Sequence, residues 1–322
     1  MLAKLLRLAM AAALGTALSA APADAFPDRP IRFIVPFPPG GSTDQVARAM
    51  QPQLEKLLGQ PVVIDNRPGA GGVIGVEAVA KSPPDGSTIG MAAAGALSIN
   101  VSLNEKMPFD PLKDLAPVSK VAESPFMLAA APSLKANSLR ELIAQAKSAP
   151  AVLAIGHGGN GTTMHLTAML FNRMAGLELP LIPYRGTAPV VTDLIGGHIA
   201  LGIVDPPPAL GAIASGKIRL LAVSSKQRFA PFQEVPTFDE QGLAGFETTG
   251  WFGIVVPAAT TPEIVAKLNA AVVATLRDPE VVQRVRSVGM EPAPLTPQEF
   301  AAYIRSEIAK YSNVAADPNV RK

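Results

Sequence analysis

Histidine often carries acid–base or metal chemistry, and this chain has only three. His157 and His165 stand in one glycine-rich segment, and His198 stands apart from them. No third ligand follows at a recognisable metal-binding spacing, and the chain has no cysteine. The sequence therefore predicts neither a metal site nor a cysteine nucleophile. For His165, a structural hydrogen bond is the favoured interpretation.

Three aspartates, Asp44, Asp65 and Asp205, each fall near the end of an expected strand. Carboxylates in such positions can act as general acids and bases if they converge. Asp44 also fits the first turn of a helix, where the helix dipole favours a negative charge. Neither a Gly-x-Ser-x-Gly turn nor a Ser-x-x-Lys element occurs, so no serine nucleophile is indicated. These side chains identify no catalytic centre, and we do not expect an enzyme.

The stretch VPFPPGGSTDQVARAM, residues 35–50, joins an apolar run to an amphipathic segment. Gly40 and Gly41 allow positive φ and a close approach of a ligand to the main chain. Ser42 with Gln45 fits a capping box, which predicts a helix over residues 43–58. The exposed start of such a helix offers N–H groups and partial positive charge to a carboxylate or phosphate. The alternative is a tight strand–helix turn that binds nothing. The core face of the helix is expected to contain Val46, Met50, Leu54 and Leu57.

Further turns follow the same strand–turn–helix order. The segment NRPGAGGVIGVEA, residues 66–78, lacks the spacing of a dinucleotide fingerprint, and no turn carries the Gly-Lys-Ser/Thr of a phosphate loop. We expect it to pack a helix against a sheet. The segment GHGGNGTTMHLTAMLF, residues 156–171, has Thr162 or Thr163 as its cap, and RGTAP has Thr187. A cleft with helix N-termini on both sides suits a small molecule with an anionic group at each end.

Short β-branched runs alternate with helical patterns over residues 30–100 and again over residues 139–223. This alternation predicts two α/β lobes with mostly parallel sheets. The proline-interrupted passage at residues 107–134 is expected to be an irregular or extended crossing between lobes, and residues 246–258 a second one. We therefore predict a first domain at residues 26–120 and 250–322, and a second at residues 121–249, with a hinge and a cleft between them. Trp251 and Phe252 could line the cleft or pack in the core.

Residues 1–25 have the pattern of a secretory signal peptide. Lys4 and Arg7 precede the apolar stretch LAMAAALGTAL, and the small residues before Phe26 predict cleavage after Ala25. No later apolar run is long enough to span a membrane, so we expect a soluble, periplasmic protein. The remaining 26 basic and 25 acidic residues give no electrostatic argument for nucleic acid or an anionic membrane. A content of 48% apolar and 17% charged residues excludes a disordered chain.

A set of segments in one order carries a family resemblance: RPIRFIVPFPPGGSTDQVAR, VVIDNRPGAGGVIG, SPPDGSTIG, GNGTTMHLTAMLF, IPYRGTAPVVTDLIGGHI, SGKIRLLAVSS, EVPTFDEQG and GWFGIVVPA. Together they closely resemble the extracytoplasmic solute receptors of the tripartite tricarboxylate transporter family, also called Bug-type receptors. The resemblance extends over essentially the whole mature chain. It implies a type II periplasmic-binding-protein fold, which is α/β and two-lobed, with a hinge and an interlobe cleft.

The resemblance also implies a function. A receptor of this type captures a small organic carboxylate, which in the family is a di- or tricarboxylate, an acidic amino acid or an aromatic acid. It delivers this ligand to membrane permease subunits, with no cofactor, no metal and no nucleic acid. We expect a monomer.

The positions that match the family's ligand-facing segments lie in both lobes. In the first lobe they are Pro38, Gly40, Gly41, Ser42 and Thr43, which would hold one carboxylate, partly through water, and then Ala94, Gly95 and Ser98. In the second lobe they are Gly159, Asn160, Gly161, Thr162, Thr163, His165, Tyr184, Arg185, Gly186, Thr187 and Asp205. The segments GHGGNGTT and VDPPPAL depart from the usual family pattern where ligand selectivity should be decided. Arg185 could pair with a carboxylate or remain a solvated loop charge.

Two other functions stay open at this point. An enzyme on the same scaffold would need acid, base or nucleophile groups that converge in the cleft. A signalling receptor would present its closed form to a membrane sensor kinase instead of a permease.

Overall fold

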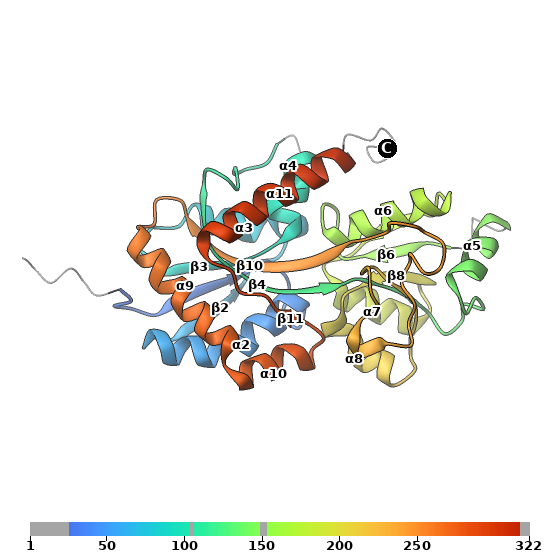
Figure 1. The fold of residues 1–322 in the computed structure, drawn as a ribbon, viewed down its shortest axis with the longest axis horizontal. Coiled ribbons are helices and arrows are strands. Elements are labelled where there is room, and N and C mark those ends of the chain that lie inside the picture. The colour runs from blue at the N-terminus through green and yellow to red at the C-terminus, as the bar shows by residue number, and fades with distance from the viewer. Residues whose placement is uncertain (1–25, 104–105, 149–152, 316–322) are drawn as a thin grey trace, which may run out of the picture.

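The structure is a computed structural model that describes residues 26–103, 106–148 and 153–315. The expected signal peptide, residues 1–25, lies outside the described residues. Two lobes lie side by side, and each is a β-sheet with helices packed on it (Figure 1). This is the α/β, two-lobed architecture that the sequence predicts.

The first lobe is built on a sheet in which β1, β2 and β3 are parallel and β10 is antiparallel to both of its neighbours. Apolar strand residues such as Phe33 and Ile34 are fully buried because helices cover the faces of the sheet. In sheet order the strands are β11 (Glu291–Pro292), β4 (Leu115–Pro125), β10 (Thr249–Pro257), β3 (Thr88–Ala93), β1 (Ile31–Val35) and β2 (Val62–Asn66). The α-helices of this lobe are α2 (Ser42–Leu58), α3 (Val73–Ala80), α4 (Asn100–Leu103), α9 (Pro262–Arg277), α10 (Pro279–Ser287) and α11 (Pro297–Ala315). A short π-helical segment, η2 (Gly95–Ile99), precedes α4.

The second lobe has its own sheet and its own apolar core. Strand β6 is parallel to β7 and β8, whereas β5 is antiparallel to β8 and β9. In sheet order the strands are β7 (Leu181–Pro183), β6 (Ile155–His157), β8 (Leu201–Val204), β5 (Met127–Ala130) and β9 (Arg219–Val223). The helices are α5 (Leu139–Ser148), α6 (Thr163–Ala175), α7 (Thr187–Gly196) and α8 (Pro206–Ala214).

Two chain crossings connect the lobes, and one serine ties them together. Strand β4 ends next to Phe126, at the start of β5, and Thr248 directly precedes β10. The Phe126 amide donates to the Ser224 hydroxyl at 2.8 Å, and this hydroxyl donates to the Thr248 carbonyl at 2.6 Å. The Thr248 amide in turn donates to the Ser224 carbonyl at 3.0 Å. Because the crossings are adjacent and hydrogen-bonded, the lobes can rotate about them as a hinge.

The passage at residues 107–134 takes the extended form of the two that the sequence left open, because it contains β4 and β5. Prolines at positions 117 and 125 lie within β4. Strand β11 pairs with β4 only at Ala122 and Glu123. Most of that side of β4 is therefore a sheet edge, and edges tolerate proline because no hydrogen bond is lost there.

Helix α2 differs from its prediction at the first turn and at one core position. Its N-cap is Gly41, without a side-chain cap, so the predicted capping box of Ser42 and Gln45 is wrong. The Gln45 side chain instead donates to the Gly40 carbonyl at 3.0 Å. On the core face Val46, Met50 and Leu54 are fully buried, but Leu57 is 43% exposed and Leu58 takes the buried position.

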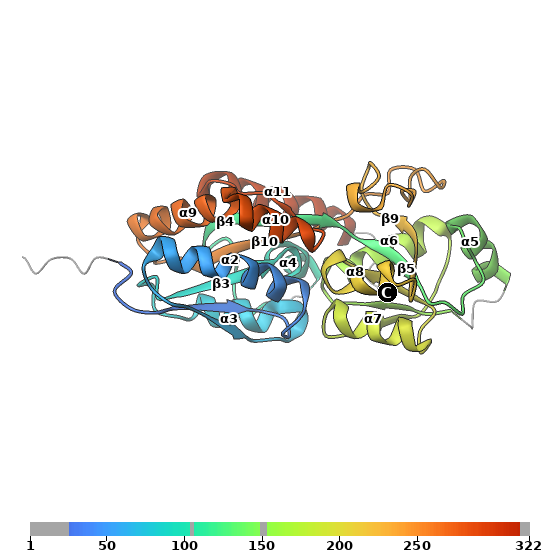
Figure 2. The same ribbon diagram turned by 90° about the horizontal axis from the view of Figure 1, so that it is seen from below.

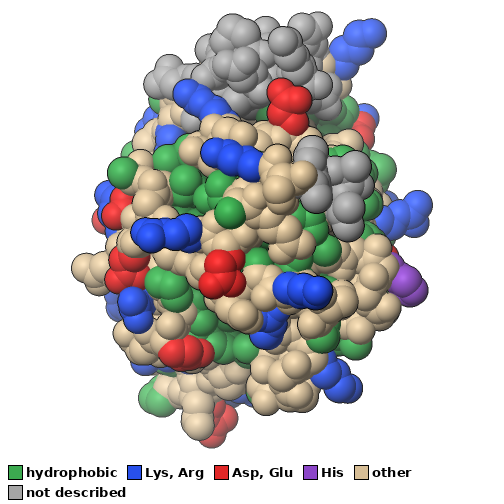
Figure 3. Space-filling model, turned by 90° about the vertical axis from the view of Figure 1, so that its right-hand side faces the viewer, with side chains coloured by type: hydrophobic (Ala, Val, Ile, Leu, Met, Phe, Trp, Pro, Cys, Tyr) green, Lys and Arg blue, Asp and Glu red, His purple; other side chains and the backbone are tan. Residues whose placement is uncertain are grey.

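Figure 3 shows Lys and Arg interspersed with Asp and Glu on the far end of the second lobe, in agreement with the small net charge of +2. This face gives no single-sign field that would suggest a polyanion partner. Among the described helices, none combines the length and apolar character needed to cross a bilayer.

Candidate functional site

A cavity of about 300 Å³ lies between the lobes, at the carboxyl ends of the central strands. This is where α/β folds of this kind place small-molecule sites, and the volume suits a small organic ligand. Its walls come from both lobes and both crossings. They are residues 37–39, 41–43, 93–95, 162–164 and 185–189, with Gly71, Ser124, Phe126, Asp205, Gly250, Trp251 and Phe252.

Three helices begin in the cavity wall. In α2 the first amide that pairs with a helical carbonyl is Gln45, which donates to Gly41, so the Thr43 amide has no partner within its own helix. The same holds for Thr163 of α6, where Leu166 makes the first such bond, to Thr162. Helix α7 begins at Thr187 after the N-cap Gly186. Three helix N-termini thus direct N–H groups and partial positive charge toward one cavity, which favours an anion.

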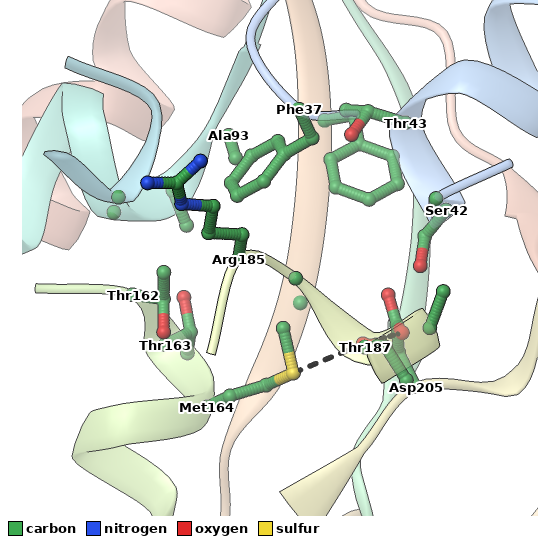
Figure 4. Close-up of a pocket in the computed structure, with 18 of the residues that line it drawn as sticks. Phe37, Ser42, Thr43, Ala93, Thr162, Thr163, Met164, Arg185, Thr187 and Asp205 are labelled. Carbon is green, nitrogen blue, oxygen red and sulfur yellow. Dashed lines mark hydrogen bonds between the residues drawn. The ribbon is translucent and has the colours of Figure 1, made fainter. Parts of the chain in front are cut away.

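Asp205 forms the buried end of the cavity and is only 4% exposed. The Thr187 hydroxyl donates to its Oδ1 at 2.5 Å, and the Ser42 hydroxyl of the other lobe lies near the same carboxylate (Figure 4). Burial raises the pKa of the Asp205 carboxyl above its usual range, against the two hydroxyls, which act to lower the pKa. Asp205 is also the N-cap residue of α8, but its side chain does not cap that helix.

Arg185 lies at the opposite side of the cavity from Asp205, as Figure 4 shows. It is an exposed residue that lines both the cavity and an outer depression, and Phe37, Pro38 and Gly71 line both as well. These four residues therefore separate the cavity from the surface. Thr162 and Thr163 lie on the same side as Arg185 (Figure 4). The cavity is polar at two opposite ends, with a cation near its mouth and a carboxylate at its buried end.

The described lobes touch each other around the cavity, so the structure is a closed form. Asn100 of the first lobe donates to the Gly161 carbonyl of the second at 3.0 Å and to the Gly95 carbonyl at 3.1 Å. Backbone packing is so tight here that a Cβ added at Gly95 would lie 2.7 Å from the Gly161 oxygen. On another side, α2 contacts α8 (Figure 2).

Comparison with known proteins agrees with this geometry. The model of the tripartite tricarboxylate transporter family receptor matches residues 46–319. The chain belongs to this family. Protein BugT of Bordetella pertussis is 41% identical over 311 residues, which are 96% of this chain and 95% of BugT.

Solved structures place this family receptor among periplasmic binding proteins. A structure described as a periplasmic transporter is 33% identical, with a TM-score of 0.88 over 92% of this chain and 99% of its own. A Rhodopseudomonas palustris protein solved with adipate is 37% identical, with a TM-score of 0.87 over 90% and 97% of the two chains. MatC of the same organism, with bound malate, is 32% identical, with a TM-score of 0.85 over 90% and 100%. The two-lobed periplasmic-binding-protein fold implied by the resemblance is therefore confirmed.

Most of the positions proposed from the sequence line the cavity of this receptor. They are Pro38, Gly41, Ser42, Thr43, Ala94, Gly95, Thr162, Thr163, Arg185, Gly186, Thr187 and Asp205.

Of the two helix caps predicted in the second lobe, one is confirmed. Thr162 caps α6 as expected, by accepting from the His165 amide at 3.2 Å. The cap predicted for Thr187 is wrong, because its hydroxyl donates to Asp205.

The other proposed positions lie outside the cavity wall. Gly159, Asn160 and Tyr184 line the outer depression, whereas Gly40, Ser98, Gly161 and His165 line neither space. Ser98 donates its hydroxyl to the Ala94 carbonyl at 2.6 Å, within its own segment. His165 accepts from the Gly161 amide at 3.3 Å, which is the structural role expected for it. As ligand contacts these positions stay predictions.

Several cavity residues were not proposed from the sequence, and most of them are apolar. Trp251 does both things that were considered for it, because it lines the cavity and is packed in the core, where its indole donates to Glu307 at 2.9 Å. Gly71 belongs to the turn that was expected only to pack a helix. No local signal marks the remainder, since an apolar residue in a wall looks like one in a core. These are Phe37, Pro39, Ala93, Ser124, Phe126, Met164, Ala188, Pro189 and Gly250, whereas Phe252, like Trp251, was considered for the cleft and does line the cavity.

The described residues include no cluster suited to metal binding. No group of three or more His, Asp and Glu side chains lies close enough there to hold a metal ion. Asp44 lies in the first turn of α2, as its structural interpretation predicts. It also accepts from the Gly40 amide at 2.9 Å and from Asn66 and Arg48, and so holds the turn that precedes the helix.

Proposed function

We propose that this protein is a periplasmic receptor that captures a small organic carboxylate between its lobes and makes or breaks no bond in it. The observation that carries the proposal is the convergence of the starts of α2, α6 and α7 on one interlobe cavity, with Arg185 at its mouth. Backbone amides and a guanidinium bind carboxylates strongly because the hydrogen bonds are charge-assisted. The adipate and malate carried by two relatives support the same ligand class.

Ligand binding between the lobes would favour the closed state of the protein. A carboxylate between the lobes would contact helix N-termini from both, which favours closure and excludes water from the hydrogen bonds. The closed form would then be recognised by permease subunits of a tripartite tricarboxylate transporter, as its family membership suggests. A pull-down from membranes tests this partner. We expect the ligand-bound form to capture such subunits and the ligand-free form not to capture them.

A thermal unfolding panel tests the ligand class. Ligand-free protein is heated with mono-, di- and tricarboxylates, aliphatic and aromatic, and with the carboxamide of each as the matched control. A ligand at about 100 times its Kd stabilises the native state by about 2.7 kcal/mol, which raises the Tm by several degrees. We expect one or a few carboxylates to raise the Tm and their amides to have no effect. Equal shifts with the amides, or no shift with any carboxylate, would contradict the proposal.

A further inference from the structure

The carboxylate of Asp205 makes one end of the cavity unsuitable for a second anion. The side chain is 4% exposed, the Thr187 hydroxyl donates to it, and the Ser42 hydroxyl of the other lobe lies near it. Among the residues that line the cavity, Arg185 is the one cation, and Figure 4 shows it on the other side. A ligand carboxylate beside Asp205 would therefore bring two sets of acceptor oxygens together in a poorly solvated space, with no cation between them, which is unfavourable.

The start of α8 strengthens this asymmetry. Pro206, Pro207 and Pro208 fill the first three positions of the helix, and proline has no N–H group. The helix that begins at the buried end therefore offers no amide to an anion, in contrast to α2, α6 and α7. The neighbouring donors are the Thr187 and Ser42 hydroxyls and the Asp205 amide. Even three donors do not exhaust a carboxylate, which can accept about four hydrogen bonds. Asp205 is thus left able to accept a hydrogen bond from a ligand.

The space between the two ends is apolar and aromatic. Phe37, Phe126, Met164, Trp251 and Phe252 all line it, and the volume is about 300 Å³. Figure 4 shows Phe37 and Met164 between the Arg185 side and the Asp205 side. An aliphatic dicarboxylate would leave these walls without a matching surface, whereas a ring or a branched hydrocarbon body would gain from burial against them.

We propose that the ligand is a monocarboxylate with an aromatic or branched apolar body and a neutral hydrogen-bond donor, a hydroxyl or amino group, at the end opposite its carboxylate. The carboxylate lies on the side of Arg185, Thr162 and Thr163, and the donor group donates to Asp205. This inference rests on the proposed function and narrows it, since it excludes ligands with an anionic group at each end.

Calorimetric titration with four probes tests the inference: 4-hydroxybenzoate, benzoate, terephthalate and adipate. Leaving a buried acceptor without a hydrogen-bond partner costs about a tenfold change in affinity or more. We expect 4-hydroxybenzoate to bind about tenfold more tightly than benzoate, and terephthalate and adipate to bind more weakly than both. If terephthalate or adipate binds as tightly as 4-hydroxybenzoate, the inference fails and the proposed function stands. If none of the four binds and no other carboxylate does, both fail.

The variant Asp205→Asn gives a second readout that a structural role of Asp205 would not produce. The amide oxygen still accepts from Thr187 and Ser42, while the amide nitrogen now presents donors to the ligand. We expect the preference for 4-hydroxybenzoate over benzoate to fall to less than threefold and the binding of terephthalate to improve. Asp239→Asn, an exposed change in the same lobe, is the control and should keep the wild-type order. An unchanged preference in Asp205→Asn would overturn the inference.

Discussion

A hydroxyl at the start of a helix can cap that helix or donate to another group, and the cavity contains both uses. Thr162 caps α6, but Thr187 donates to Asp205, and Ser42 of the other lobe lies near the same carboxylate. Because Asp205 is buried, the Thr187 hydrogen bond is worth more there than at a solvated cap. Asp205 is thus a contact between the lobes as well as part of the wall.

His157 gives the fold a pH dependence that can be measured. Its ring is fully buried at the end of β6 and stacks on His165 at 4.6 Å. Burial, with a smaller effect of His165, lowers the pKa of His157 from 6.5 to about 4. Between pH 4 and pH 6.5 the unfolded chain therefore binds a proton at His157, whereas the folded chain does not. Above pH 6.5 His157 does not reduce the free energy of unfolding. As the pH drops to 4, its protonation in the unfolded chain lowers the free energy of unfolding by up to about 3 kcal/mol.

Urea unfolding of wild type and His157→Gln across pH 4 to 7 measures this effect. The glutamine variant is less stable at pH 7, because a packed ring is lost, but its stability should fall less steeply below pH 6.5. Parallel pH profiles for the two proteins would show that another group causes the acid sensitivity.

At the scale of elements, the alternation of strands and helices was readable because each unit carries its own periodicity. The run IRFIV became β1, and its burial pattern follows from helices on both faces of the sheet. The crossings were harder, because prolines at positions 117 and 125 argue against a strand unless its edge position is known. Edge position is a property of the assembled sheet, and the sequence does not contain it locally.

The N-cap of α6 should influence both stability and binding. In Thr162→Ala the hydrogen bond to the His165 amide is lost, which costs about 1 kcal/mol of folding free energy. Because the same turn lines the cavity, we expect carboxylate binding to weaken several-fold. Thr261→Ala, at the N-cap of α9 and outside the cavity, is the matched control. It should lose stability in urea unfolding while its calorimetric Kd stays unchanged. Equal Kd values for both variants would show that the start of α6 does not contribute to carboxylate binding.

At the scale of the whole molecule, function depends on contacts between residues far apart in the chain. The sequence indicated a cleft and several glycine-rich turns at its edge, and most of the proposed turns do line the cavity. It could not show that Ser42, Thr187 and Asp205 meet, because that requires the lobes to be closed on each other. The apolar wall formed by residues such as Phe126 and Met164 was missed for the same reason.

Closure itself can be tested at Gly161, where the lobes are in contact. A Cβ there would lie 2.2 Å from the Asn100 side-chain oxygen of the other lobe. Gly161→Ala should therefore displace the Asn100 side chain and break its hydrogen bond to the Gly161 carbonyl. We expect the closed form to be weakened, so that the radius of gyration in solution scattering with ligand present increases and the Kd rises at least tenfold. Gly197→Ala has nearly the same backbone strain, with φ of +70° against +73°, but nothing within 4 Å of the added carbon. It should lose similar stability, about 1 kcal/mol, and keep wild-type scattering and affinity.

The central claim is that a carboxylate is held in the interlobe cavity, and calorimetric titration of two arginine variants tests it most directly. The probe is the carboxylate that gives the largest rise in Tm. Arg185→Gln removes the one cation in the cavity wall, whereas Arg277→Gln removes an exposed cation at the end of α9. The account predicts one site per chain, wild-type affinity for Arg277→Gln, and binding at least tenfold weaker for Arg185→Gln. Equal affinity in the two variants would contradict it and place the carboxylate elsewhere.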